Sequence, residues 1–530
     1  MRLVTRTLLL AVTLVFHVDH LYAQLDTIAM RYAKTITVGE LKDHLYELSS
    51  DAYEGRETGM PGQKKAAAYI ADYYKLLGIA PVVNGSYYQQ YPLKRVRYGE
   101  SNFQLGDQKF LFKEDFYFFG HDGEVEIDAS QIAFVGFGIE DPKYNDYNGV
   151  DVAGKTLMCL SGEPKDKAGN SLITGTNGMS EWSEDFRKKM DLAQAKGAKA
   201  IIIIEGDFDN YITRIRYWLD QPRLTLDYSS SQDEKTISYF FISPKLADLI
   251  LKAGKSKPSA ELRKKIEKKK NSKVVLMNST LKIHVKQDVE RIYAENILAF
   301  IEGSDPVLKN EIVVVSAHYD HIGIVNGQIN NGADDDGSGT VGSLEIAEAF
   351  QLAKNEGHGS KRSILILNVS GEEKGLLGSE WYSEFPVYPL KSTVCDLNID
   401  MIGRHDEQHE TQREYVYLIG SDKLSTQLHT LSEKSNSDYT KLSLDYTYND
   451  PEDPNRFYYR SDHYNFAKHG IPVIFYFSGV HEDYHQPGDD PEKIEYEKMA
   501  TIVKLVFHTA WEVANRKERL IVDVENNFEK

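Results

Sequence analysis

The sequence has only two cysteines in 530 residues, Cys159 and Cys395. Each lies between apolar neighbours, in KTLMCLSG and STVCDLNID, as residues of buried strands do. Two cysteines allow at most one disulfide, between Cys159 and Cys395, and a chain with a large core does not need it. We predict two free thiols with a structural role.

Basic residues are scarce relative to acidic ones. The chain has 62 Lys and Arg against 80 Asp and Glu, which gives a formal net charge of -18 and a pI near 5.4. This charge argues against nucleic acid or an anionic membrane surface as the main partner. Beyond the N-terminal region no stretch is apolar for long enough to span a bilayer, so we expect no integral membrane segment in the mature chain.

The N-terminus, MRLVTRTLLLAVTLVFHVDHLYAQ, is the one long apolar run. Arg2 and Arg6 precede apolar residues from Leu8 to about Val18, and Ala23 follows, which is the three-part pattern of a secretory signal peptide. We predict a signal peptide over residues 1–23 and export to the periplasm or the extracellular space. No cysteine stands at the expected cleavage region, which argues against a lipid anchor.

The length exceeds that of one ordinary core, and 41% hydrophobic residues suffice for packed structure. TVGELKDHLYELSS and GQKKAAAYIADYYKLLGI have apolar residues at helical spacing, and residues 88–125 alternate aromatic with polar residues, as half-buried strands do. From about residue 126, short strands broken by Gly and Asp accompany the helix SEDFRKKMDLAQAKG. The basic run AELRKKIEKKKNSK ends this segment, and we interpret it as a solvated helix with Leu262 and Ile266 turned inward.

These changes predict three parts in the mature chain. Residues 24–125 begin a main domain, residues 126–280 form an inserted smaller domain that is α/β or rich in strands, and residues 281–530 complete the main domain. After residue 290, near-continuous apolar strands such as EIVVVSAHYD and RSILILNVS alternate with helices. This pattern predicts an α/β fold with a mostly parallel sheet covered by helices on both faces.

In such sheets ligands bind beyond the carboxyl ends of the strands, and here those ends carry carboxylates and imidazoles. They are His318 and Asp320, the run Asp334, Asp335 and Asp336, the pair Glu372 and Glu373, Asp400, and His481 and His485. Three adjacent carboxylates raise one another's cost of ionisation, so they need solvent or a bound cation. Imidazoles with carboxylates and no thiolate favour Zn²⁺, and more than four ligands favour two ions that share one carboxylate.

Five segments, SAHYDHIG, NGADDDGSG, SGEEKGLLGS, LNIDM and DYHQPGDD, resemble the metal-site motifs of the co-catalytic di-zinc aminopeptidase family, whose relatives include glutamate carboxypeptidases. The order and spacing match over residues 290–515, and the helices after EGRETGMPGQ are similar to the family's N-terminal part. Residues 126–280, with YNDYNGVDVAGK and AQAKGAKAIIIIEG, resemble the protease-associated domain that some members carry as an insertion. The resemblance implies a zinc-exopeptidase fold, two zinc ions per chain and peptide substrates.

The resemblance also implies a ligand set, position by position. Asp335 would bridge the two ions, with His318 and Asp400 completing one site and Glu373 and His485 completing the other.

Two further aspartates would support these ligands. Asp320 would accept the second ring N–H of His318, and Asp336 would shape the turn or bond groups around the ligands. The peptide between Asp335 and Asp336 is cis in relatives, so the resemblance implies the same here.

Glu372 is left as the general base, taking a proton from the attacking water and passing it to the leaving amine. Tyr459, in RFYYRSDHY, is the candidate donor to the oxyanion. The implied function is that of an exported zinc exopeptidase, with an aminopeptidase favoured.

Alternatives remain open for the function and for single residues. The chain could be a glutaminyl cyclase-like enzyme with a single zinc, or a non-catalytic relative of the receptor type, although the full ligand set and Glu372 favour a peptidase. We interpret His321 as a structural hydrogen-bonding residue and His481 as an exposed loop imidazole. In RSDH, a helix cap at Ser461 or Asp462 explains the motif, with a contact to a metal ligand as the alternative.

Overall fold

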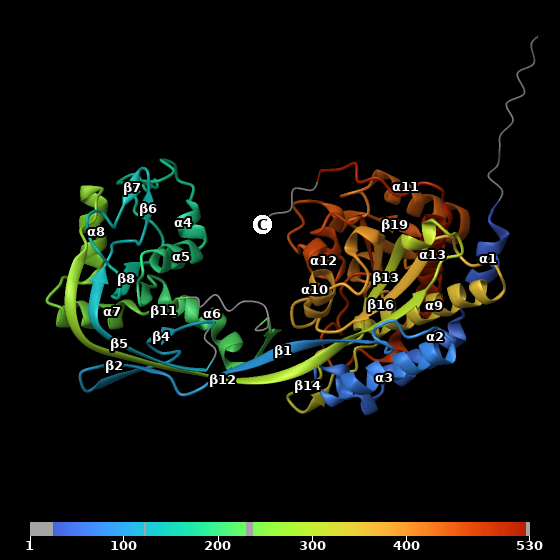
Figure 1. The fold of residues 1–530 in the computed structure, drawn as a ribbon, viewed down its shortest axis with the longest axis horizontal. Coiled ribbons are helices and arrows are strands. Elements are labelled where there is room, and N and C mark those ends of the chain that lie inside the picture. The colour runs from blue at the N-terminus through green and yellow to red at the C-terminus, as the bar shows by residue number, and fades with distance from the viewer. Residues whose placement is uncertain (1–24, 121–122, 229–236, 526–530) are drawn as a thin grey trace, which may run out of the picture.

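A computed structural model describes residues 25–120, 123–228 and 237–525. It has two lobes joined by two long strands, β1 (Tyr88–Tyr98) and β12 (Val275–Ile301), which pair in antiparallel register (Figure 1). Among the described residues, no helix combines the length and the apolar character needed to cross a membrane. The predicted signal peptide, residues 1–23, lies outside the described residues.

The larger lobe is built on the sheet β19-β18-β20-β17-β13-β16-β12. Its strands, besides β12, are β13 (Ile312–His318), β16 (Ser363–Val369), β17 (Thr393–Ile399), β18 (Tyr415–Ile419), β19 (Ser443–Asp445) and β20 (Val473–Phe477). β13 runs parallel to β16 and β17, and β17 runs parallel to β20, whereas β12 and β18 are antiparallel to their neighbours β16 and β20. The predicted α/β fold with a mostly parallel sheet is confirmed.

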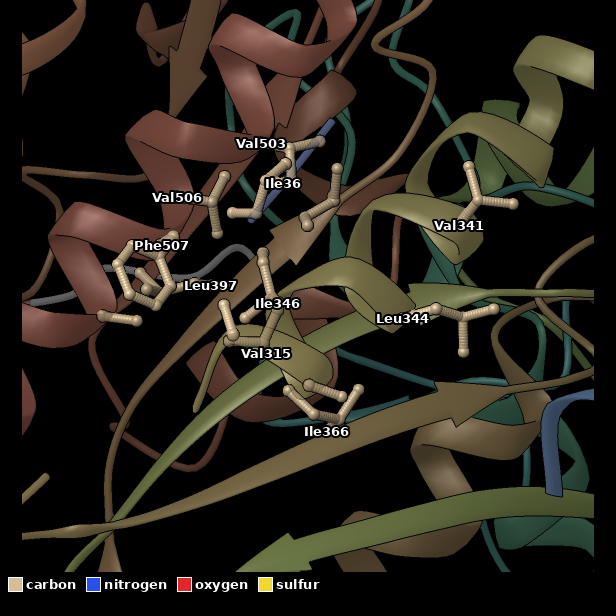
Figure 2. Close-up of a cluster of buried hydrophobic side chains, with 14 of the residues drawn as sticks. Ile36, Val315, Val341, Leu344, Ile346, Ile366, Leu397, Val503, Val506 and Phe507 are labelled. Carbon is tan, nitrogen blue, oxygen red and sulfur yellow. The ribbon is translucent and has the colours of Figure 1, made fainter. Parts of the chain in front are cut away.

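Helices cover both faces of this sheet, because alternate strand residues point to opposite sides. Val313 and Val315 join a core under one set of helices, and Val314 joins a second core under another. The first set is α1 (Thr27–Ala33), α2 (Val38–Leu48), α3 (Pro61–Leu76), α9 (Gly339–Asn355), α11 (Thr426–Ser435) and α13 (Tyr496–Asn515). The second is α10 (Leu377–Glu384) and α12 (His463–Ala467). Figure 2 shows Val341, Leu344 and Ile346 of α9 in the first core.

The smaller lobe continues the same sheet beyond β12, with β5 (Gly123–Phe134), β8 (Thr156–Leu160), β9 (Ala200–Ile204) and β11 (Ser238–Ile242) parallel to one another. Its helices are α4 (Glu181–Glu184), α5 (Arg187–Ala195), α6 (Phe208–Asp220), α7 (Pro244–Ala253) and α8 (Ser259–Lys269). The remaining short strands of this lobe are β2 (Asn102–Leu105), β3 (Gln108–Leu111), β4 (Phe116–Tyr117), β6 (Glu140–Asp141) and β7 (Tyr144–Asn145). In α8, Leu262 and Ile266 are buried, as predicted.

The hydrophobic core of the smaller lobe includes residues that precede the predicted start of the insertion. Phe103, Phe110 and Phe116, which precede the predicted boundary at residue 126, pack in the core of the smaller lobe. The pairing of β1 with β12 ends where the Gly99 N–H donates to the Lys286 carbonyl. These contacts favour limits near residues 99 and 286 for the insertion, whose identity as a protease-associated domain stays a prediction.

One strand of the insertion returns to the larger lobe. β10 (Arg223–Leu226) pairs with β1, and Tyr228 then reaches α10. The Tyr228 ring stacks on Trp381 and its hydroxyl donates to Glu380 at 2.8 Å. The lobes are therefore joined by side-chain packing as well as by the two strands. Both cysteines, Cys159 in β8 and Cys395 in β17, are free and buried, as predicted.

Candidate metal centre

Four parallel strands of the larger lobe deliver the predicted site residues to one edge of the sheet. β13 ends at His318, β16 is followed by Gly371 in the left-handed region (φ 78°) and then by Glu372, and β17 is followed by Asp400. β20 leads into the loop that carries His485. Because parallel strands share the position of their carboxyl ends, residues far apart in sequence meet there. The structure brings His318, Asp335, Glu373, Asp400 and His485 together.

The first ligand group consists of His318, Asp335 and Asp400, whose ligand atoms all lie within 4.8 Å of one another. The His318 Nε2 atom is 3.3 Å from Asp335 Oδ1 and 3.7 Å from Asp400 Oδ1. All three side chains are buried. One imidazole with two carboxylates, and no thiolate, suits Zn²⁺.

A second group surrounds the other oxygen of Asp335. His485 Nε2 lies 3.1 Å from Asp335 Oδ2 and 3.2 Å from Glu373 Oε2. His321, interpreted from sequence as a structural residue, also enters this group: its Nδ1 is 2.8 Å from Glu373 Oε1 and 3.8 Å from Asp335 Oδ2. His485 is closer to Asp335 than His321 is, whereas His321 is closer to Glu373. The shorter distance to the shared Asp335 and the position on the cavity wall favour His485 as the ligand and His321 as a hydrogen-bonding partner of Glu373.

The three adjacent aspartates have three different environments. Asp335 presents one oxygen to each ligand group. Asp336 instead accepts backbone N–H groups of His318, Gly339 and Met401 at 2.8–3.2 Å. Asp334 accepts the Gly403 N–H at 2.6 Å and faces His481 Nε2 at 3.4 Å. The peptide between Asp335 and Asp336 is cis, as the resemblance implied.

Burial and charge act in opposite directions on the ionisation of the ligands. Burial raises the pKa of Asp335 and of Glu373, but bonds from His318 and His485 hold the pKa of Asp335 well below its usual value, and bonds from His321 and His485 bring that of Glu373 to about 2. Burial lowers the pKa of His485, while Asp335 and Glu373 raise it to about 10. The carboxylates therefore carry their charge and need cations beside them, which is the condition for a metal site.

Glu372 differs from the ligands in its electrostatics. Burial and the charges of Glu373 and Asp400 raise the pKa of its carboxyl well above the usual value, against the effect of His318. Its Oε2 is 3.9 Å from His318 Nε2, so Glu372 lies beside the first ligand group but belongs to neither group. A carboxyl group that holds a proton readily and faces the cavity can move protons during a reaction.

Asp320 contacts His318 in a different way from that predicted. The His318 Nδ1 atom lies 3.1 Å from the backbone carbonyl oxygen of Asp320 and 3.8 Å from its carboxylate. The carboxylate accepts the Thr58 hydroxyl at 2.6 Å and the Glu372 N–H at 3.3 Å. Asp320 thus orients His318 through its main chain and the Glu372 turn through its side chain.

Two further residues support the predicted ligands, and one of them, Asp489, was not identified from sequence. The Asp489 carboxylate accepts the N–H groups of Asp334 and Asp335 at 3.0 and 3.1 Å. Ser461 donates its hydroxyl to Asp400 Oδ2 at 2.7 Å. For Ser461 the contact with a metal ligand, which the sequence left as the alternative, is therefore observed. The signal for Asp489 was its place in DYHQPGDD, four residues after His485.

The cavity at the centre has a volume of about 30 Å³. Asp335, Glu372, Asp400 and His485 form its polar wall, with Arg460 and Tyr484 beside them, and its apolar wall is made by Met401, Phe457, Phe475, Phe477 and Val480. The Tyr484 ring stacks on His485 with centroids 3.9 Å apart, and Arg460 Nη2 donates to the Tyr484 hydroxyl at 3.4 Å.

Tyr459, the tyrosine chosen from sequence, lies elsewhere. It is not part of the cavity wall, and its ring packs on Tyr458 and Tyr464. Two further histidines are buried. His481, interpreted from sequence as an exposed loop imidazole, pairs with Asp334, and His463 stacks on Phe475, where burial lowers its pKa to about 3. His481 is thus a buried support and not the exposed imidazole expected.

A known protein family matches the segment that holds the predicted ligands. Residues 296–510 match the model of peptidase family M28. We call residues 296–510 the M28 segment. The M28 segment contains all five predicted ligands and Glu372, whereas α1 to α3 and the insertion lie outside it.

Curated relatives match a part of the chain. A "Probable leucine aminopeptidase" of Trichophyton verrucosum (strain HKI 0517) is 33% identical over 216 residues, which are 39% of this chain and 56% of that protein. "Aminopeptidase YwaD" of Bacillus subtilis (strain 168) is 27% identical over 218 residues, 39% of this chain and 42% of that protein. The chain thus spans about half the length of these two relatives.

A solved structure resembles nearly the whole chain. The "Aminopeptidase from Aneurinibacillus sp. strain AM-1" has a TM-score of 0.51 at 19% identity, covering 94% of this chain and 99% of that one. At this identity the likeness concerns the fold alone. It extends beyond the M28 segment and so includes most of both lobes.

Proposed function

We propose that the protein is an exported zinc aminopeptidase that removes N-terminal residues from peptides, with two zinc ions and Glu372 as general base. One observation carries the proposal: the two oxygens of Asp335 face two separate groups of imidazole and carboxylate, with Glu372 beside them. The aminopeptidase names of the M28 relatives support the same reaction class.

The residues present fit two zinc ions. His318 and Asp400 would hold one, Glu373 and His485 the other, and Asp335 both. When bound, zinc polarises the substrate carbonyl and lowers the pKa of a coordinated water toward 7, which makes water a nucleophile at neutral pH.

The chain's own groups would move the protons. Glu372 accepts a proton from the attacking water as the carbon–oxygen bond forms, and it returns that proton to the leaving nitrogen as the carbon–nitrogen bond breaks. The Tyr484 hydroxyl lies on the cavity wall and is our candidate for the donor to the developing oxyanion, in place of Tyr459. Burial raises the pKa of Tyr484, which keeps its proton available for donation.

The cavity wall favours a particular kind of substrate side chain. The apolar wall formed by Phe475, Phe477 and its neighbours suits an apolar N-terminal side chain.

The decisive experiment is a panel of fluorogenic amino-acid and dipeptide amides with free and acetylated N-termini. We expect hydrolysis of free Leu and Phe substrates, no hydrolysis of their acetylated forms, loss of activity with a chelator, and recovery with zinc. Equal turnover of acetylated substrates would contradict an aminopeptidase.

Zinc content separates this function from the glutaminyl cyclase alternative. The sharing of Asp335 between two groups favours two ions, whereas a cyclase-like enzyme would bind one. We expect two zinc ions per chain by mass spectrometry of metals and no cyclisation of an N-terminal Gln peptide. One zinc with cyclisation would favour the alternative.

A further inference from the structure

The segment Gly55–Thr58, within the motif EGRETGMPGQ, lies outside the M28 segment and carries none of the proposed ligands. It nevertheless contains two buried polar side chains, Arg56 and Thr58, each 1% exposed. Both reach the carboxyl edge of the sheet from the N-terminal side of the chain. Their partners show what the segment does there.

Arg56 joins two segments that carry ligands. Its Nε donates to the carbonyl of Tyr319 at 2.8 Å, which is the residue between His318 and Asp320. Its two Nη atoms donate to the carbonyls of Asn331 at 2.6 Å and Gly332 at 2.8 Å, in the loop that leads to Asp335. A further bond, at 2.9 Å, reaches the carbonyl of Leu48 at the end of α2.

The backbone of Gly55–Thr58 also bonds to the residues that follow β13. The Gly55 carbonyl accepts the Gly323 N–H at 3.0 Å, and the Arg56 carbonyl accepts the His321 N–H at 3.3 Å. Gly55 has φ 66°, and a Cβ there would lie 2.4 Å from the Asn330 carbonyl oxygen, so only glycine permits this approach.

Thr58 completes the contact through Asp320. Its hydroxyl donates to Asp320 Oδ2 at 2.6 Å, while Asp320 Oδ1 accepts the Glu372 N–H at 3.3 Å. Thr58 therefore fixes a carboxylate that lies between the His318 segment and the Glu372 turn. With the Thr58 hydroxyl removed, a fully buried carboxylate oxygen would lose its donor.

The charge of Arg56 also matters. The four hydrogen-bond acceptors of Arg56 are neutral backbone carbonyls. Its guanidinium charge is attracted by four nearby carboxylates, those of Asp489, Asp320, Asp335 and Asp336. A cation held there offsets part of the mutual repulsion of the buried acids.

We propose that Gly55–Thr58 is a positioning element of the metal centre, in which Arg56 sets the separation of the His318 and Asp335 segments and Thr58 fixes Asp320. The inference rests on the proposed zinc function. Removing such a supporting hydrogen bond typically weakens metal affinity about 10–100-fold, since the ligands are no longer held in the geometry that the ion needs.

The test measures zinc affinity of the full-length mature chain by competition with a chromophoric chelator, alongside thermal unfolding of the metal-free protein. The variants are Thr58→Val, Thr58→Ser and Arg56→Lys. Thr393→Val is the matched control, because Thr393 is a buried threonine, 2% exposed, at the amino end of β17 on the opposite edge of the sheet. We expect Thr58→Val to weaken at least one zinc site about 10–100-fold, with Thr58→Ser restoring it and Thr393→Val leaving it unchanged.

Arg56→Lys keeps the charge but cannot reach four carbonyls, so we expect weaker binding of both ions. The readouts separate the two proposals. Folded Thr58→Val protein that binds both ions as tightly as the parent overturns the positioning role, even if the parent is an aminopeptidase. Zinc affinity that depends on Thr58 in a parent that hydrolyses no peptide would leave the positioning role standing and remove the proposed function.

Discussion

At the scale of single residues, the run Asp334–Asp336 shows how three identical side chains have different roles because their partners differ. Backbone N–H groups occupy the oxygens of Asp336, and Gly403 and His481 engage those of Asp334. Only Asp335 is left with both oxygens facing imidazoles. The assignment of the bridge follows from this distribution of hydrogen bonds, which the order of residues alone does not contain.

Replacing Asp335 with Asn should therefore remove both zinc ions together, because each loses a shared anionic ligand. The measurement is zinc content per chain after gel filtration, with Asp334→Asn as the matched control that keeps both ions. A variant of Asp335 that retained two zinc ions would transfer the bridging role to a neighbouring aspartate.

Glu372→Gln should retain zinc but lower kcat about a thousandfold, since the amide is nearly the same size and cannot accept the proton. The assay is turnover of a free Leu amide with metal content measured on the same sample. Near-parental turnover in the zinc-loaded variant would dismiss Glu372 as the base.

The two tyrosines can be tested as a pair. Tyr484→Phe should lower kcat about 100-fold because the oxyanion loses a donor, whereas Tyr459→Phe should stay within about threefold of the parent. Steady-state kinetics on one substrate suffices. The opposite ranking would return the role to Tyr459, the residue first chosen from sequence.

At the scale of elements, the sequence predicts most helices and strands of the larger lobe. Thr37 caps α2 at the start of the predicted helical segment, and the strands that end at His318, Val369 and Ile399 lie where their apolar runs end. These features depend on local periodicity, which the sequence contains. The 27-residue length of β12 and its pairing with β1 were not predicted, because pairing depends on residues about 200 positions apart.

The same distinction applies to the site. The residue types of the predicted ligands, and the strands that carry them, could be predicted because acidic residues and histidines directly follow apolar runs. Which of His321 and His485 faces the cavity, and which tyrosine lines it, depends on loop conformation, and nothing in the local residue pattern records that.

The helix α13 carries a buried group that should make stability depend on pH. His508 is 4% exposed and stacks on Tyr439, and burial lowers its pKa to about 4. An unfolded histidine titrates near 6.5, so between pH 6.5 and 4 the unfolded chain binds more protons and stability falls as pH falls, by up to about 1.4 kcal/mol per pH unit from this group.

The His508→Gln variant should show a shallower loss of stability across that window, by about one proton in the linkage slope. The measurement is the midpoint of urea unfolding from pH 7 to pH 4.5 for both proteins, on metal-free samples. Parallel slopes would show that His508 is not the group responsible.

At the scale of the whole molecule, the cores of the two lobes are separate. The buried residues of the smaller lobe's clusters all lie between Phe103 and Val285, and those of the two main cores of the larger lobe lie outside that range. The shared contacts are those of β10 and Tyr228 with β1 and α10.

Replacing residues 100–285 with Asn-Gly should therefore leave a folded larger lobe, because Gly99 and Lys286 are paired and a two-residue turn can join them. We expect two zinc ions in the shortened chain and a loss of about 3 kcal/mol of stability from exposing the surface that Leu226 and Tyr228 cover. Circular dichroism and zinc analysis give the answer. An unfolded product would show that the lobes fold only together.

The strand β12 leaves the smaller lobe and pairs directly with β16 through Ile297–Asn368 and the residues that follow. A chain of about 90 Å in extended form thus reaches from the outer sheet to the strand whose end presents Glu372, given 27 residues at ~3.3 Å each. A continuous ladder of strand pairs, and not a flexible linker, therefore connects the insertion with the strand that precedes Glu372.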